Sequence, residues 1–281
     1  MKLLITGANG FIGSNLKNFL EKKFGSKKLT IITKNKNIVT KTYWKDIPKV
    51  DLVIHLASKS NVRDSWFSQA EYVNKNILGT IRVLDFCKKN KIKLIFFSSY
   101  LYHGLSQIKS KETDKLKYNN PYALTKKNSE EWCNFYAKNF NMDICILRLF
   151  NVYGKFQKNK FYISSISDKL KKNNVIFINK KIFRDYLHID DLNVLILKII
   201  KNNKKIKGCE TYNVGYGEAF NLFEIANILK EFLNSSSKIS HFNKVDKNQI
   251  MYTRANISKI SKAFNWFPKV SIYNGLKKII K

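Results

Sequence analysis

The feature that most constrains the fold is the stretch from Lys2 to Leu20. Residues 2–6 form a short apolar run, which predicts a buried strand. Gly7, Gly10 and Gly13 follow it in the spacing GxxGxxG, and a helical pattern then continues through Leu20. A strand, a glycine-rich turn and a helix in this order predict a dinucleotide-binding unit. Glycine permits the tight turn and lets the backbone approach a pyrophosphate at the positive end of the helix.

The rest of the chain alternates between strand and helix patterns. Apolar runs predict further strands near residues 29–33, 50–57, 94–97 and 144–148, and helical patterns cover residues 68–90 and 121–139. Such alternation predicts an α/β protein with a parallel, doubly wound sheet.

The residue type at the end of the second strand bears on the choice of cofactor. A NAD-binding unit is expected to carry an acidic residue about 20 residues after the glycines, where it holds the ribose 2′-hydroxyl. No Asp or Glu lies between Glu21 and Asp46, and Lys34 ends the strand. A cation at that place suits a 2′-phosphate, so the sequence favours NADP over NAD.

A tyrosine and a lysine stand four residues apart at the start of the 121–139 helix. This spacing places Tyr122 and Lys126 on one face, one above the other. An ammonium in that place stabilises a phenolate, and lowering a tyrosine pKa to neutrality requires about 4 kcal/mol. The pair is therefore a candidate proton-transfer unit, although a lysine-rich chain also produces such pairs on ordinary helix surfaces.

The composition excludes several classes of protein. The net charge is +32, but only 5 of the 52 basic residues are arginine and the lysines are dispersed, so we expect no nucleic-acid partner. No run of apolar residues is long enough for a membrane span, and the start does not read as a signal peptide. Four cysteines without paired spacing indicate reduced thiols in a cytoplasmic protein.

The order and spacing of these motifs resemble the extended short-chain dehydrogenase/reductases that modify nucleotide sugars. The resemblance runs nearly end to end. Besides the glycine turn and the Tyr122/Lys126 pair, it rests on segments 55–57, 76–80, 98–99 with Gly104, 148–154, 184–191, 212–215 and 265–268. It implies a Rossmann-like fold, a nucleotide-sugar substrate of the kind used in polysaccharide biosynthesis, and a homodimer formed through helices near residues 68–90 and 120–139.

The resemblance also implies roles for individual residues. Tyr122 is expected to act as general acid/base, with Lys126 lowering its pKa and bonding the nicotinamide ribose, and with Ser99 polarising the reacting oxygen. Residues expected at the cofactor are Gly7, Gly10, Phe11, Ile12, Gly13, Lys34, Asp46, Ile47, Leu56, Ala57, Asn76, Tyr122 and Lys126. Residues expected at the substrate are Asn151, Arg184 and Arg254, and no metal site is expected.

The chain departs from the dehydratase members of that group. Those members carry an Asp-Glu pair directly after the catalytic hydroxyl, where this chain has Tyr100 and Leu101. Dehydration is therefore not expected. NADPH-dependent reduction of a nucleotide-linked 4-keto-6-deoxyhexose is favoured, and the alternatives are an NAD-dependent 4-epimerase and a catalytically inactive nucleotide-binding protein.

The same resemblance predicts two domains. Residues 1–150, with about 182–205, are expected to form the NAD(P)-binding domain. Residues 151–181 and 206–281 are expected to form a smaller, discontinuous substrate domain. The ligand is expected at the carboxyl ends of the strands, between the two domains.

Overall fold

The computed structural model describes residues 1–25, 29–34, 37–100, 109–115, 118–158, 160–244 and 250–280. The chain divides into two compact units. The first comprises residues 1–102, 116–149 and 196–212, and the second comprises residues 103–115, 150–195 and 213–281. Residues 182–195 thus group with the second unit, whereas the sequence placed them with the cofactor domain. The assignment of cofactor and substrate to separate domains stays a prediction.

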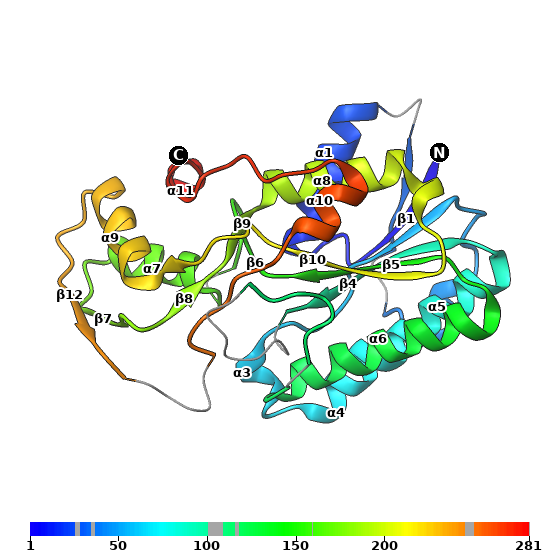
Figure 1. Cartoon of the computed structure of the whole chain (residues 1–281), viewed down its shortest axis with the longest axis horizontal. Helices are drawn as coiled ribbons and strands as arrows, with labels where there is room; N and C mark the ends of the chain where they lie inside the picture. Colours follow the sequence, from blue (N-terminus) through cyan, green and yellow to red (C-terminus); the bar gives the residue numbers. More distant parts are fainter. Residues whose placement is uncertain are drawn as a thin grey trace. The chain divides into compact units, whose positions relative to one another are not determined.

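A six-stranded sheet forms the centre of the first unit (Figure 1). Its order is β10 (Cys209–Val214), β5 (Ile144–Leu149), β4 (Lys93–Ser99), β3 (Leu52–His55), β1 (Lys2–Thr6) and β2 (Thr30–Ile32). The pairs β1–β2, β1–β3, β3–β4 and β4–β5 are parallel. The prediction of a Rossmann-like doubly wound sheet is confirmed.

The strand order determines where a ligand can bind. The chain places β2 on one side of β1 and then returns to place β3 on the other. The strand order therefore reverses at β1, and in such sheets the crevice for a ligand lies at the carboxyl ends of the strands around the reversal. Thr6, Ile32 and His55 end these strands.

Helices cover both faces of this sheet, with α1 on one face and α5 and α6 on the other (Figure 1). The helical segments of the first unit before β5 are α1 (Phe11–Phe24), α2 (Lys41–Trp44), α3 (Val62–Ser65), α4 (Gln69–Tyr72), η1 (Val73–Leu78), α5 (Gly79–Asn90) and α6 (Pro121–Phe140). The predicted helix over residues 68–90 is three segments, α4, η1 and α5. The middle one, η1, is a π-helix, a form that often occurs at functional sites.

The core of the first unit lies between the sheet and α5 and α6. Phe96 of β4 and Ile146 of β5 belong to one buried cluster with Leu84 of α5 and Cys133 of α6, and all four are fully buried. Burying an apolar side chain of this size contributes about 2 kcal/mol relative to leaving it exposed. This cluster fixes α6 against β4 and β5.

The ends of α6 are defined by its sequence. The Asn120 side chain accepts a hydrogen bond from the Ala123 N–H at 2.8 Å, and Pro121 occupies the first turn, where its missing N–H costs nothing. Asn141 ends the helix in the left-handed conformation with φ of 52°. Tyr122 and Lys126 are thereby placed in the first two turns.

The second unit contains three two-stranded sheets and its own apolar core. Its strands pair as β6 (Asn151–Tyr153) with β9 (Tyr186–His188), β7 (Ile176–Asn179) with β12 (Ile239–Phe242), and β8 (Phe183–Arg184) with β11 (Phe220–Asn221). The remaining helices of the chain are α7 (Tyr162–Lys171), α8 (Ile189–Lys201), η2 (Asn203–Lys205), α9 (Leu222–Phe232), α10 (Ser258–Phe264) and α11 (Ile272–Ile280). In the parts of the chain described, no helix is both long and apolar enough to cross a membrane.

Candidate cofactor and catalytic site

The three glycines after β1 differ in how closely the surrounding backbone approaches them. Gly7 has φ of +74°, and a Cβ there would lie 2.6 Å from the backbone nitrogen of Ala57. A Cβ on Gly13 would lie 2.3 Å from the carbonyl oxygen of Gly7. At Gly10 the only atom within 4 Å is that same oxygen, at 3.3 Å. Gly7 and Gly13 are therefore required by the turn itself, whereas Gly10 leaves space on its open side.

The helix that follows the turn is suited to an anion. Gly10 is the N-cap of α1, no side chain caps the helix, and its first turn carries no acidic residue. The first N–H groups of a helix lack partners within the helix, and the helix dipole is positive there. A pyrophosphate fits this end on both counts.

A pocket of about 360 Å³ adjoins the turn. Its lining comes from residues 7–10, residues 33–34 and 37–38 after β2, residues 56–59 after β3, and Lys75 of η1. Among the residues that the structure describes, three lysines and no acidic residue belong to this lining. The volume lies within the usual range for small-ligand sites. The glycine cradle, the uncapped helix end and the cationic lining together fit a dinucleotide.

The structure gives Lys34 partners within the protein. Its ammonium donates hydrogen bonds to the carbonyl oxygens of Tyr43, at 3.0 Å, and of Lys45. The side chain lines the pocket, as expected, but its charge is engaged in holding the segment around α2. Lys34 therefore favours NADP less strongly than the sequence alone indicated.

The other predicted cofactor residues fall into two groups. Gly7, Gly10, Leu56 and Ala57 line the pocket. The remaining ones lie outside its lining: Phe11, Ile12 and Gly13 in the first turn of α1, Asp46 and Ile47 after α2, Asn76 in η1, and Tyr122 and Lys126 in α6. Asp46 is exposed and has φ of 62°, and Ile47 packs against the core of the first unit.

Asn76 shapes the pocket instead of lining it. Its side-chain oxygen accepts from the Lys59 N–H at 2.8 Å, and its amide donates to the Lys59 carbonyl and to the Thr125 hydroxyl, each at 3.0 Å. This buried amide ties the loop after β3 to both η1 and α6. Lys59, which lines the pocket, is thereby held at a fixed place.

Ser99, Tyr122 and Lys126 lie together in the first unit. Ser99 ends β4 and is hydrogen-bonded to Tyr122, and both side chains are buried. Burial raises the pKa of Tyr122 to about 12, and the Ser99 hydrogen bond acts in the opposite direction. Lys126 is not among the groups that shift this pKa, so its expected effect on Tyr122 stays a prediction.

Lys126 is itself an unusual lysine because only 4% of it is exposed. Its ammonium lies over the ring of Phe96, 4.4 Å from the centroid. Burial lowers the pKa of Lys126 to about 8, and Cys133 and Glu130 act in the opposite direction. A buried lysine that titrates near neutrality is typical of functional sites.

His55 has a structural role. Its two ring nitrogens lie 2.7 Å from the Thr6 hydroxyl and 3.2 Å from the Thr80 hydroxyl. Burial and the charge of Lys126 lower the pKa of His55 to about 3, so the ring is neutral. It joins β1 and β3 to α5.

The predicted substrate residues all lie in the second unit. Asn151 donates to the Asp185 carbonyl at 3.1 Å. Arg184 donates to the carbonyls of Phe183 and Ile250, and Arg254 donates to the Gly217 carbonyl at 3.0 Å. The structure thus fixes these side chains on backbone carbonyls, and their contact with a substrate stays a prediction.

Sequence reasoning missed several residues that this geometry brings forward. Lys59 and Lys75 line the pocket. Their positions in the sequence, shortly after a predicted strand and directly before Asn76, were the signal that could have identified them. Asp185 is a buried carboxylate that accepts from the N–H groups of Tyr216, Gly217 and Ala255, a contact that no local pattern reveals. Glu130, four residues after Lys126, was detectable from its spacing.

Several known proteins resemble this chain along its whole length. A UDP-glucuronate 4-epimerase of Thermodesulfobacterium geofontis is 29% identical, covering 99% of this chain and 94% of that protein. The CDP-abequose synthase of Salmonella typhimurium is 25% identical, covering 99% of this chain and 97% of that protein. The crystal structure of a UDP-glucuronic acid 4-epimerase from Bacillus cereus, in complex with UDP-glucuronic acid and NAD, is 28% identical. It matches with a TM-score of 0.88 over 100% of this chain and 98% of that one.

A family model covers most of the chain. Residues 3–215 match the model of the NAD dependent epimerase/dehydratase family. This stretch includes the glycine turn, the pocket residues and the Ser99, Tyr122 and Lys126 side chains. The chain belongs to the NAD-dependent epimerase/dehydratase family, as its motifs predicted.

Proposed function

We propose that this protein is an NAD(P)-dependent nucleotide-sugar oxidoreductase in which hydride transfer takes place at a sugar carbon, C4. The observation that carries the proposal is the buried arrangement of Ser99, Tyr122 and Lys126. The Ser99 hydroxyl is bonded to the Tyr122 phenol, and Lys126 follows one helical turn later. These groups share a unit with the glycine-turn pocket. A bound nicotinamide dinucleotide would supply the hydride chemistry.

The three side chains have complementary tasks in this proposal. Tyr122 holds the proton that is exchanged with the sugar oxygen, and Ser99 orients that oxygen by hydrogen bonding. Lys126 brings a positive charge to the site, which favours the phenolate. Without such a charge a phenol with a pKa raised to about 12 is a poor base at neutral pH.

Reduction of a 4-keto-6-deoxyhexose with NADPH is the first candidate. The support is that Thr33 and Lys34, rather than a carboxylate, follow β2 in the pocket lining. A carboxylate there would repel a 2′-phosphate, whereas Lys34, Lys59 and Lys75 give the lining a positive charge.

Epimerisation at C4 with bound NAD is the second candidate. Two observations support it. The Lys34 ammonium already has two carbonyl partners, and the two UDP-glucuronate epimerases described above are 28% and 29% identical to this chain. Since both reactions use the same three side chains, Ser99, Tyr122 and Lys126 do not separate them.

The distinguishing experiment supplies the purified protein with either substrate. A nucleotide-linked 4-keto-6-deoxyhexose with NADPH is followed at the nicotinamide absorbance band, and stoichiometric oxidation with a 4-hydroxy product supports the reductase. UDP-glucuronate with catalytic NAD tests the epimerase, and formation of the C4 epimer without net oxidation would overturn the reductase. Titration of NADPH against NADH, repeated with Lys34→Ala, measures whether Lys34 contributes to the preference.

On the substrate side, we propose that Asn151, Arg184 and Arg254 contact the nucleotide diphosphate. Arginine binds such groups through paired N–H donors. Arg254→Lys keeps the charge and loses the paired geometry, so KM for the nucleotide sugar should rise while cofactor affinity stays unchanged. An unchanged KM would exclude Arg254 from the binding site.

We also propose that the protein is a cytoplasmic homodimer. The support for the dimer is a set of exposed aromatic side chains on α6, in which Trp132 and Phe135 are 38% and 49% exposed. The support for the compartment is that Cys87 and Cys133 are buried free thiols. Analytical ultracentrifugation of the wild type and of Phe135→Glu tests the dimer, because a charge in an apolar interface should yield monomers.

A further inference from the structure

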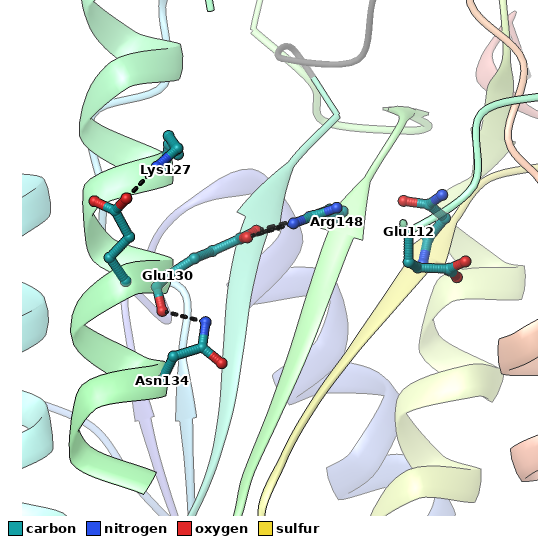
Figure 2. Close-up of polar contacts among 7 residues, drawn as sticks. Glu112, Lys127, Glu130, Asn134 and Arg148 are labelled. Carbon is teal, nitrogen blue, oxygen red and sulfur yellow. Dashed lines mark hydrogen bonds and ion pairs between the residues drawn. The ribbon is translucent and has the colours of Figure 1, made fainter. Parts of the chain in front are cut away.

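A buried ion pair lies one helical turn beyond Lys126. Glu130 of α6 and Arg148 of β5 are 4% and 6% exposed. The Arg148 Nη2 donates to Glu130 Oε2 at 2.8 Å, and its Nε lies 3.0 Å from Oε1 (Figure 2). Folding removes both charges from water, which costs free energy unless the pair has a well-formed geometry.

The pair continues the face of α6 that carries the proposed catalytic groups. Tyr122, Lys126 and Glu130 follow one another at intervals of four, so the three side chains lie along one face of the helix. Figure 2 shows Glu130 extending from α6 toward Arg148 on β5. In the sheet, Arg148 is opposite Ser98, directly before Ser99. The ion pair is therefore adjacent to the proposed catalytic groups: Glu130 follows Lys126 on the same face of α6, and Arg148 is paired with the residue before Ser99.

Glu130 is the carboxylate among the groups that act on the pKa of Lys126. Cys133 and Glu130 both act to raise the pKa of Lys126 against the effect of burial. Burial raises the pKa of the Cys133 thiol well above its usual value, so this thiol is uncharged at neutral pH. His55 is neutral as well.

The elements packed against α6 carry further charges, namely Arg63 and Asp64 on α3, Glu71 on α4, Lys75 on η1, Arg82, Asp85, Lys88 and Lys89 on α5, and Lys93 on β4. Glu71 binds Lys59, and Asp85 accepts from the Tyr136 hydroxyl. Lys88 lies over the rings of Tyr136 and Phe140, and Lys93 pairs with Asp143. Among the described residues, the groups that raise the Lys126 pKa are Cys133 and Glu130.

We propose that Glu130, fixed in place by Arg148, is a positioning residue that keeps Lys126 charged in the interior of the protein. A carboxylate without a buried partner would itself take up a proton or turn toward water. Arg148 prevents this, so the negative charge remains one turn from Lys126. This inference rests on the proposed role of Lys126 in hydride-transfer chemistry.

The chain offers a matched control on the same helix. Lys127 and Glu131 also form an ion pair at i,i+4, but their side chains are 25% and 59% exposed. Glu131→Gln removes the same chemical group one residue away, at the surface. Solvent screens such pairs, so this change should leave Lys126 unaffected.

The first measurement is the titration of Lys126 in the cofactor-free protein. Lysine side chains are labelled with ¹³C at Cε, and the Lys126 signal is identified by its absence in Lys126→Met. In Glu130→Gln the midpoint should fall by about one pH unit or more, as expected for loss of a close opposite charge. In Glu131→Gln it should not move. An unchanged midpoint in Glu130→Gln overturns the proposal.

The second measurement separates positioning from folding. Glu130→Gln removes the carboxylate that Arg148 binds and is expected to lower the thermal midpoint. Glu130→Leu combined with Arg148→Met replaces the pair by apolar side chains, which is often neutral for stability. This double variant should recover the thermal midpoint while Lys126 still titrates at the lower pH. If Glu130→Gln does not fold, the double variant alone tests the proposal. A Lys126 titration midpoint equal to that of the wild type in the double variant would show that the ion pair serves only the fold.

The third measurement is the pH dependence of kcat/KM. The alkaline limb should move to lower pH in Glu130→Gln and in the double variant, so that activity lost at pH 8 is recovered near pH 6. A loss of equal size at every pH would indicate a structural role. Because the NMR titration uses neither cofactor nor sugar, an enzyme that fails to act on nucleotide sugars contradicts the proposed function without deciding this inference.

Discussion

The glycine turn and the buried face of α6 serve the proposed reaction by opposite means. At the turn, the backbone forms the site and side chains must be absent: Gly7 and Gly13 are closed in by neighbouring backbone, and Gly10 is exposed with one backbone oxygen 3.3 Å from the place of a Cβ. On α6, the side chains form the site and must be present, and Tyr122, Lys126 and Glu130 are all more than nine-tenths buried. The polar groups of the turn belong to the backbone, and the N–H groups at the start of α1, which lack partners within the helix, would bind the ligand. A side-chain site places a phenol, an ammonium and a carboxylate where each costs free energy.

The largest expected effect is on cofactor binding at Gly10. Its φ of −76° and ψ of 170° are accessible to valine, and no atom nearer than 3.3 Å opposes a Cβ. Gly10→Val should therefore lose less stability than a substitution at Gly7 or Gly13 and should lose dinucleotide binding, because the branched side chain fills the space beside the pyrophosphate site. Isothermal calorimetry with NADH and NADPH and a thermal melt check both parts. Retained binding would mean that the dinucleotide does not approach the turn.

The next effect is on turnover at Tyr122. Tyr122→Phe removes one hydroxyl and keeps the ring, so packing against Tyr72, at 6.4 Å between centroids, is preserved. We expect turnover to fall about 10²-fold or more, the usual contribution of a positioned acid/base, with cofactor affinity unchanged. Steady-state kinetics with the preferred nucleotide sugar is the measurement. Near wild-type turnover would exclude Tyr122 as the proton donor.

The stability cost of the buried ammonium has a definite pH dependence. The Lys126 pKa falls from 10.5 to about 8 on folding, so between these values the unfolded chain binds more protons, and the free energy of unfolding rises with pH. Below pH 8 the cost is fully present and amounts to about 3 kcal/mol. Lys126→Met should be more stable than wild type at pH 7, and the gain should shrink as pH rises from 8 toward 10.5.

Urea denaturation at several pH values measures this difference. Lys127→Met is the control, since that lysine is part of an exposed pair. A stability change in Lys126→Met that does not vary with pH would show that the ammonium is not the source of the cost.

The smallest expected effect distinguishes the two kinds of glycine. A Cβ on Gly13 would lie 2.3 Å from the Gly7 oxygen and 2.7 Å from the Ala8 Cα, so the turn must shift. Gly13→Ala should lower the free energy of unfolding by about 1–3 kcal/mol, the range for overpacked sites. Unlike Gly10→Val, it should impair stability and cofactor binding together. Equal stability of the two variants would remove the distinction drawn between these glycines.

The sequence by itself determined the elements of the fold and the identity of the main site residues. Period and composition are local, so the strands at 2–6 and 144–148 and the helix over 121–139 were predictable, and the glycine spacing indicated a dinucleotide site. The i,i+4 spacing on α6 also predicted that Tyr122 and Lys126 share a face. What the local pattern could not supply was burial, since burial depends on which other elements pack against that face.

Only the tertiary structure decided the charge states and the partners of these residues. From the sequence, Lys34 is a cation available to a phosphate. In the structure its ammonium binds the carbonyls of Tyr43 in α2 and of Lys45, the next residue after α2. From the sequence, Asn76 is a predicted cofactor contact. In the structure its side-chain amide is hydrogen-bonded to the backbone of the loop after β3. The burial of Lys126 and Glu130 depends on β4 and β5, which cover them, and Arg148 of β5 lies beside the carboxylate. In each case the decisive partner is distant in sequence or buried by distant elements. Electrostatic energy depends on distance and dielectric environment, which only the folded chain sets.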